Sequence, residues 1–208
     1  SISSINSTTS SLRARNINLT SREGNVIYTT DILPIFNNVG DRLYASLSAG
    51  ETLSLNAGND INLFGVNFNN NKNTSFVAQN NITILNSTND LITHKRGNDT
   101  LSNQERFDNT FFNLNKINSS ESILAKAEGD IKLSGISFSA GRNIDLIANG
   151  RVIIDAKKVG DTYNDFIPLT RTPSLSSSLN TQGDLLINVV SLLILKLVIL
   201  YDETNVNC

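Results

Sequence analysis

One block of the chain, residues 121–156, repeats a short apolar pattern that strands satisfy and helices do not. It contains four steps in which two apolar residues flank a third residue, Ile131/Leu133, Ile136/Phe138, Ile144/Leu146 and Val152/Ile154. Residues two apart on a strand point to the same face, so each step predicts a strand that places two side chains in one core. Turn-forming Gly, Asn and Asp residues separate the steps. The block therefore predicts short strands joined by tight turns.

The same block recurs along the chain. Residues 57–66 match residues 127–136 with one insertion, and residues 75–85 lie over residues 137–147 without gaps. Residues 11–20 are a third copy of the latter segment, and residues 182–187 are a partial copy of the Gly-Asp-apolar step. This alignment makes Ile17, Ile82 and Ile144 equivalent positions. Internal repeats of this kind are typical of a solenoid rather than of two globular domains.

The connections between steps are too short for a flat parallel sheet, which needs crossovers of about a dozen residues or more. In a coil of parallel strands, each strand instead pairs with its equivalent one turn later. Ile131 and Val152 are 21 residues apart, a suitable length for one turn. The sequence therefore predicts an all-β protein, a parallel β-helix with Ile, Leu, Val and Phe stacked inside.

Composition shifts divide the chain into three parts. Residues 1–11 read as an irregular lead-in, residues 12–188 as the β-helix, and residues 189–208 as an atypical apolar tail. Polar or Pro-containing loop excursions interrupt the β-helix at residues 31–42, 94–119 and 157–178. We expect all three to leave from one corner of the coil, because only there can the chain depart without breaking a sheet.

The tail admits three interpretations. Its apolar run is shorter than the ~20 residues that a membrane-spanning helix needs, and it carries Lys196. A buried or edge strand is therefore favoured over a span; a third interpretation is an accidental tail where the native continuation is lost. The absence of Met predicts that the chain is a fragment or a processed piece.

The residue inventory argues against several kinds of site. With 17 basic and 19 acidic residues, the chain offers no basic patch for nucleic acid. The lone cysteine, Cys208, closes no internal disulfide, and the lone histidine, His94, lies in a polar excursion without a catalytic partner. The acidic residues are isolated in turns and loops, unlike the paired carboxylates of carbohydrate-cleaving enzymes. We therefore expect no enzymatic activity, cofactor or small-molecule substrate.

Three aspartates and three asparagines recur at turns. Asp60, Asp130 and Asp184 precede strands that we take as equivalent, and they suit tight turns. Calcium is the alternative, but the paired glycines and nine-residue period of calcium-binding coils are missing. Asn residues at repeated turn positions are expected to stack as amide ladders from coil to coil; these are Asn16, Asn81 and Asn143. The Asn-x-Ser/Thr triplets at Asn18, Asn73, Asn81 and Asn86 follow from the Asn-rich composition, so we predict no glycosylation.

The repeated phrases A-G-x-D-I-x-L and A-G-x-N-I-x-L-x-A at residues 57–63, 127–133 and 140–148 resemble a known family. They are similar to the haemagglutinin repeats of filamentous haemagglutinin and of contact-dependent growth-inhibition exoproteins, over roughly residues 12–188. The resemblance implies a right-handed β-helix exported through a dedicated outer-membrane channel and held at the bacterial cell surface.

Two functions follow from this resemblance. The chain would be a structural stalk of a secreted surface exoprotein, serving adhesion or contact-dependent toxin delivery in virulence. Alternatively, the excursions would grip a receptor or a glycan on a target cell, since loops on a rigid scaffold commonly bind ligands. The expected partners are the outer-membrane secretion channel and a target-cell receptor.

Overall fold

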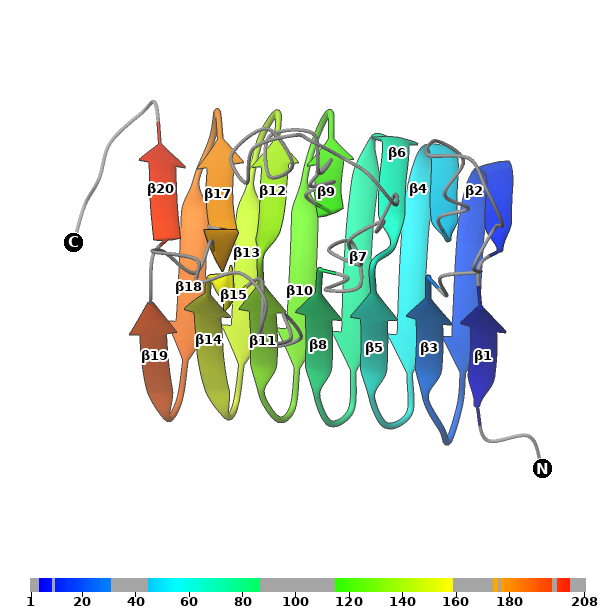
Figure 1. Ribbon diagram of the computed structural model, residues 1–208, viewed down its shortest axis with the longest axis horizontal. Coiled ribbons are helices and arrows are strands. Elements are labelled where there is room, and N and C mark those ends of the chain that lie inside the picture. Colours follow the sequence, from blue (N-terminus) through cyan, green and yellow to red (C-terminus); the bar gives the residue numbers. More distant parts are fainter. Residues whose placement is uncertain are drawn as a thin grey trace, which may run out of the picture.

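The computed structural model describes residues 4–8, 10–30, 45–86, 115–158, 174–175, 177–195 and 198–202. Strands are the regular secondary structure of these residues, and no helix among them is long and apolar enough to cross a membrane. The strands stack side by side along the long axis of the molecule, with the two termini at opposite ends (Figure 1). The predicted all-β parallel β-helix is confirmed.

The coil has three faces. The first face is one parallel sheet made of β1 (Ile5–Thr8), β3 (Val26–Thr29), β5 (Ile61–Phe64), β8 (Ile82–Leu85), β11 (Ile131–Ser134), β14 (Arg151–Asp155) and β19 (Leu192–Leu195). The second face contains β6 (Asn67–Asn71), β9 (Asn115–Ser119), β12 (Ile136–Ala140), β17 (Ser177–Thr181) and β20 (Val198–Asp202). The third face contains β7 (Asn73–Ala78), β10 (Ile123–Ala127), β13 (Ile144–Ala148) and β18 (Leu185–Val189).

Two long strands join the second and third faces into one sheet. These are β2 (Ser11–Ser21) and β4 (Ser46–Ala57), and β4 pairs with β6 through its first half and with β7 through its second half. In later coils a bend separates the two halves. A short antiparallel pair, β15 (Lys157–Lys158) and β16 (Ser174–Leu175), lies apart from the stack.

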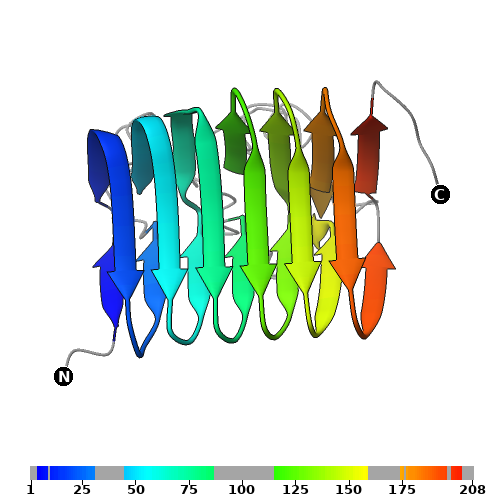
Figure 2. The ribbon, with the colours of Figure 1, turned by 180° about the vertical axis from the view of Figure 1, so that it is seen from behind.

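The coil is right-handed. Figure 1 shows the first face in front with its strands rising, and Figure 2 shows the third face from behind with its strands descending, while the chain advances from β1 toward β20. Ile61 pairs with Ile82, and Ile131 pairs with Val152. Both pairs have the 21-residue spacing that the sequence predicts for one turn.

The apolar-x-apolar steps fill one continuous core. Ile144 and Leu146 are fully buried, as are Val152 and Ile154. Between the second and third faces, the rings of Phe68 and Phe76 meet edge to face with centroids 5.8 Å apart. Because every coil contributes side chains to this core, neighbouring coils hold each other in register.

Three predicted boundaries differ from the structure. The lead-in is not irregular, since Ile5–Thr8 is β1 and pairs with β3. The second excursion does not extend to Ser119, because residues 115–119 form β9, and the third does not extend to residue 178, because Ser177 and Ser178 begin β17. The short polar strands of the second face, such as NKINS, carry few apolar residues and resemble loops in sequence. Residues 31–42 and 94–114, with His94, lie outside the described residues.

The tail continues the coil instead of departing from it. Residues 185–189 pair with β13, residues 192–195 with β14, and residues 198–202 with β17. The run looked atypical because several of its outward-facing positions are apolar as well as its inward ones. The equivalence of Ile82 with Ile17 and Ile144 is also wrong: Ile82 lies on the first face opposite Ile61, whereas Ile144 lies on the third face opposite Ile123.

Candidate functional site

Three long intervals of the sequence fall at the corner between the first and second faces. The intervals 31–44 and 87–114 follow the first-face strands β3 and β8, and the interval 159–173 follows β14 and the two-residue strand β15. The connections from β5 to β6 and from β11 to β12 turn this corner at Gly65 and Gly135, with φ of 67° and 64°. Non-glycine residues avoid this left-handed conformation. Coils that carry an interval have Thr30, Asn86 or Ala156 at the equivalent position.

Pairing between coils persists up to the start of an interval. The Asn86 N–H donates to the Ser134 carbonyl at 3.0 Å, just as the Gly65 N–H donates to the Leu85 carbonyl. Among the described residues, the Asn86 amide and Oδ1 of Asp155 are buried without a hydrogen-bond partner. Buried polar groups of this kind cost free energy. Both groups lie at the first-face side of this corner.

A polar groove lies on the outer side of the second face. It encloses about 310 Å³ between β9, β12 and β17, and its lining is Lys116, Asn118, Ser137, Ser139, Ser178, Leu179 and Asn180. The hydroxyl of Ser178 donates to that of Ser137 at 2.9 Å. Hydroxyls, amides and one ammonium can hold a polar ligand by hydrogen bonds. This lining contains no carboxylate or imidazole for acid–base chemistry.

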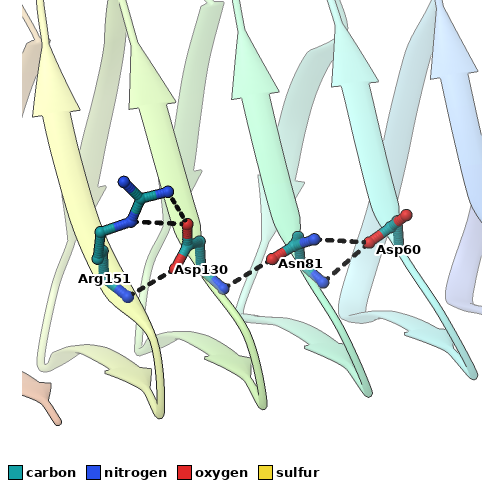
Figure 3. Close-up of polar contacts among 4 residues, drawn as sticks. All are labelled: Asp60, Asn81, Asp130 and Arg151. Atoms are coloured by element: carbon teal, nitrogen blue, oxygen red, sulfur yellow. Dashed lines mark hydrogen bonds and ion pairs between the residues drawn. The ribbon is translucent and has the colours of Figure 1, made fainter. Parts of the chain in front are cut away.

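A ladder of hydrogen bonds from backbone N–H groups to side-chain oxygens runs along the corner between the third and first faces. We call it the turn ladder; its members are Ser4, Asn25, Asp60, Asn81, Asp130 and Arg151. From Asn25 on, each member donates its backbone N–H to the side-chain oxygen of the member one coil earlier, at 3.1, 3.1, 2.9, 2.8 and 2.7 Å in turn. Figure 3 shows the last four members and the contacts between them.

The turn ladder holds the register across long intervals. Its members from Asn25 to Arg151 are separated by 35, 21, 49 and 21 residues. The two longer separations contain the intervals 31–44 and 87–114. The same type of contact forms on both sides of each interval, so the coil continues as if the interval were not present.

Charge along the ladder alternates. Asn81 separates the two carboxylates, and its Nδ2 donates to Oδ1 of Asp60 at 3.2 Å. At the far end Arg151 donates from Nε and Nη2 to Oδ2 of Asp130, at 2.9 and 2.6 Å. These hydrogen bonds hold the pKa of Asp130 below its ordinary value. Within the turn ladder, no two carboxylates occupy successive coils, so like-charge repulsion between its members is avoided.

A second ladder follows the bend between the second and third faces. Oδ1 of Asn16, Asn73 and Asn143 accepts the backbone N–H of Thr52, Ser122 and Asp184, one coil later in each case. Close by, burial and the charge of Asp184 raise the pKa of Asp145. The predicted Asn ladder at Asn16 and Asn143 therefore exists in a different form, since Oδ1 of each accepts a backbone N–H.

The structure separates residues that the sequence grouped together. Asp60 and Asp130 share the turn ladder with Asn81, whereas Asp184 lies on the bend with Asn16 and Asn143. Asp184 precedes a third-face strand, and the Gly-Asp-apolar phrase occurs before strands of both faces. Within the described residues, no three His, Cys, Asp or Glu side chains gather where they could hold a metal ion.

Sequence reasoning missed Asn25 and Arg151 as ladder members. Both directly precede an apolar-x-apolar step of the first face, at the position that Asp60 and Asp130 occupy. That position was the available signal, but Arg does not fit a search for Asn or Asp.

Comparison with known proteins finds a family of repeats that matches part of the coil. Residues 44–107 match a family model described as a hemagglutinin repeat. This segment, 64 of the 208 residues, is similar to the hemagglutinin repeat of the filamentous haemagglutinin family. The matched hemagglutinin repeat begins just before β4 and includes β5 to β8, so it covers first-face, second-face and third-face strands. No curated protein and no solved structure matches the chain.

The hemagglutinin repeat confirms the predicted resemblance. It supports an exoprotein of the filamentous haemagglutinin type, a family generally found among secreted surface proteins.

Proposed function

We propose that this chain is part of the structural stalk of a secreted bacterial surface exoprotein, serving adhesion or contact-dependent toxin delivery. The observation that carries the proposal is the unbroken register of the turn ladder, which continues across intervals of very different length. A stalk needs a constant cross-section and a length set by the number of coils, and a solenoid with nearest-neighbour contacts supplies both.

The proposal extends to export and location. As the family resemblance implies, a dedicated outer-membrane channel exports the chain to the cell surface. Stacking one coil on the next lets such a protein fold as it emerges, because each coil needs only its predecessor as a template. The function requires no catalytic activity, cofactor or small-molecule substrate.

Deleting one coil tests the stalk directly. Removal of residues 131–151 brings Val152 to the position of Ile131, one turn earlier, and Asp130 keeps its place in the turn ladder. In bacteria that display the protein, we expect the shorter stalk to fold and to lower adhesion or toxin delivery by reducing reach. Unchanged activity after loss of one and then two coils would contradict the stalk.

The alternative is binding through the excursions to a receptor or a glycan. It is favoured by the common corner from which the intervals 31–44, 87–114 and 159–173 depart, which would align them along one edge of the coil. The polar groove of the second face borders this corner.

A matched excision separates the two functions. Removing residues 87–114 and replacing Asn86 by Gly recreates the one-residue corner of Gly135. The excision stops at 114 because Asn115 begins β9. The stalk predicts unchanged melting temperature and unchanged activity. Unchanged melting temperature with abolished cell binding would assign the binding to this excursion.

A further inference from the structure

A threonine hydroxyl joins the two ends of the first interval. Thr30 directly precedes the interval 31–44, and Ala45 directly follows it. Oγ1 of Thr30 accepts the backbone N–H of Ala45 at 2.9 Å, and it donates to the carbonyl of Gly65 in the next coil. One hydroxyl therefore connects the residue before the interval, the residue after it and a neighbouring coil. We call such a hydroxyl a bridge.

The interval 159–173 has a bridge of the same kind, formed from its other side. Asp155 ends β14 before this interval, and Ser177 begins β17 after it. The hydroxyl of Ser177 donates to the Asp155 carbonyl at 2.6 Å. It also accepts the backbone N–H of Ile136, in the preceding coil, at 3.2 Å. Again one hydroxyl joins both sides of an interval and a neighbouring coil.

Ser177 stands where the preceding coil has an apolar residue. Extending the pairing of Ser137 with Ser178 by one residue places Ser177 opposite Ile136, and both are only 1% exposed. A buried hydroxyl costs free energy unless it is hydrogen-bonded. Both hydrogen bonds of Ser177 go to backbone groups at this corner, so the bridge rather than core packing accounts for a serine here.

The residue before the interval 87–114 forms no such bridge. Asn86 takes the place of Thr30, since its N–H donates to the Ser134 carbonyl just as the Thr30 N–H donates to the Phe64 carbonyl. The Asn86 side chain is 3% exposed, and neither Nδ2 nor Oδ1 has a hydrogen-bond partner. A polar side chain at this corner is thus not sufficient, and the bridges are a specific feature of Thr30 and Ser177.

We propose that Thr30 and Ser177 are positioning residues that hold the two ends of their intervals together, so that the coil keeps its register whatever sequence the interval contains. Each bridge closes the corner with one hydroxyl and fixes it to a neighbouring coil. The interval itself then needs to contribute nothing to the coil, and one scaffold can carry different intervals. This device serves a stalk and a binding module alike, and it is independent of the function proposed above.

Amide hydrogen exchange of the full chain, followed residue by residue by nuclear magnetic resonance, tests the first bridge. Thr30→Val keeps the shape of the side chain and removes its hydroxyl. Exchange of the Ala45 N–H should become about fivefold faster or more, the factor that corresponds to one lost hydrogen bond. Thr29→Val, whose hydroxyl contacts Thr8 instead, should leave Ala45 unchanged. Unchanged exchange of Ala45 in Thr30→Val would overturn the bridge.

A second matched pair tests the bridge of the interval 159–173. Ser177→Ala should speed exchange of the Ile136 N–H by a similar factor. Ser178→Ala is the control, because its hydroxyl donates to Ser137 at 2.9 Å and contacts neither side of the interval. Equal effects of the two substitutions on Ile136 would show a general loosening of β17 and would refute the bridge.

Replacing the content of an interval tests whether the bridge alone holds its ends. Residues 33–42 are exchanged for a Gly/Ser segment of equal length, with Thr30 and Ala45 kept. The bridge predicts that exchange of the Ala45 N–H stays as slow as in the parent. Faster exchange of Ala45 with Thr30 intact would show that residues of the interval hold its ends together, and the proposal would be wrong.

Discussion

Replacing Asn81 by Asp probes the alternation of charge along the turn ladder. In the parent, the backbone nitrogen of Asp130 lies 2.8 Å from Oδ1 of Asn81 and donates to it. The substitution keeps an oxygen at this position. It replaces Nδ2, which donates to Oδ1 of Asp60 at 3.2 Å, by a second oxygen. Three carboxylates would then occupy successive coils.

The magnitude follows from these distances. Two charges about 4 Å apart interact by ~1 kcal/mol in water and ~4 kcal/mol near a protein surface. Because the ladder is partly exposed, we expect the free energy of unfolding to fall by about 2–3 kcal/mol at neutral pH and low salt. Asn81→Ala, which only loses hydrogen bonds, should cost about 1–2 kcal/mol and show little dependence on pH.

The pH dependence distinguishes repulsion from simple loss of contacts. Neighbouring carboxylates raise the folded-state pKa of the new Asp above its ordinary value. The penalty is therefore complete above that raised pKa and disappears as the pH falls below the ordinary value. Urea unfolding followed by circular dichroism at pH 7 and pH 3 measures it.

A control and a contradicting outcome complete the test. Asn62→Asp, on the outer side of β5 between Ile27 and Thr83, has no carboxylate opposite it and should change stability little. If Asn81→Asp were no less stable than Asn81→Ala at pH 7, or if their difference did not change at pH 3, alternation of charge would not govern the ladder.

Three further predictions test the core, the ion pair and the corner. Ile144→Asp should lower the free energy of unfolding by about 4 kcal/mol or more by burying an unpaired charge. Asp145→Asn should be neutral or slightly stabilising at pH 7, because the pKa of Asp145 is raised. Equal melting temperatures for Ile144→Asp and the parent would show that the inward phase is wrong. Arg151 lowers the pKa of Asp130, so the ion pair stabilises the parent until the pH falls through that lowered pKa. Arg151→Gln lacks this ion pair and should therefore lose less stability on acidification. Identical profiles of stability against acid pH for the two proteins would contradict the pairing. Gly135→Ala should cost about 1–2 kcal/mol of stability, because the φ of Gly135 is 64°. Gly50→Ala should cost much less, since its added Cβ would meet nothing closer than 3.7 Å. Equal costs in thermal unfolding would contradict the requirement for glycine at this corner.

The inward pattern was readable from sequence because a two-residue period is a local property. Ile144, Leu146, Val152 and Ile154 are buried as predicted, and the 21-residue turn follows from the spacing of two such steps. A buried face leaves little freedom in phase, since a shift by one residue would turn every apolar side chain outward.

The assignment of strands to faces was not readable in the same way. The steps at Ile82 and Ile144 share an Asn before the first apolar residue, yet one lies on the first face and the other on the third. The face depends on how many residues the preceding intervals contribute, which no local pattern encodes. Arg151 was missed for a different reason: the 21-residue spacing already placed it beside Asp130, but a search for Asn or Asp at this position passes over Arg.

The second face and the tail were misread for compositional reasons. β9 and β17 contain one apolar residue each, Ile117 and Leu179, and place Ser119, Ser177 and Thr181 at buried positions, which resembles loop sequence. The strands β18 and β19 instead expose Leu186 and Leu192, which hides the alternation that marks the other strands.

Distances along one column of the third face test the coil most directly. Asn18, Ser54, Asp145 and Leu186 occupy equivalent outward positions, and Asp145 and Leu186 pair with one another directly. Spin labels at paired positions, with Cys208 replaced by Ser and unlabelled protein in excess, report distances by pulsed electron resonance. Strands in a sheet are ~4.8 Å apart, so four coils separate Asn18 from Asp145 by about 19 Å, and five coils separate Asn18 from Leu186 by about 24 Å.

The pair Ser54 and Leu186, also four coils apart, should give the same distance as Asn18 and Asp145. Narrow distributions at these values, increasing by one strand spacing per coil, are the result that a single register across all intervals predicts. Broad distributions, or unequal distances for the two pairs four coils apart, would contradict it.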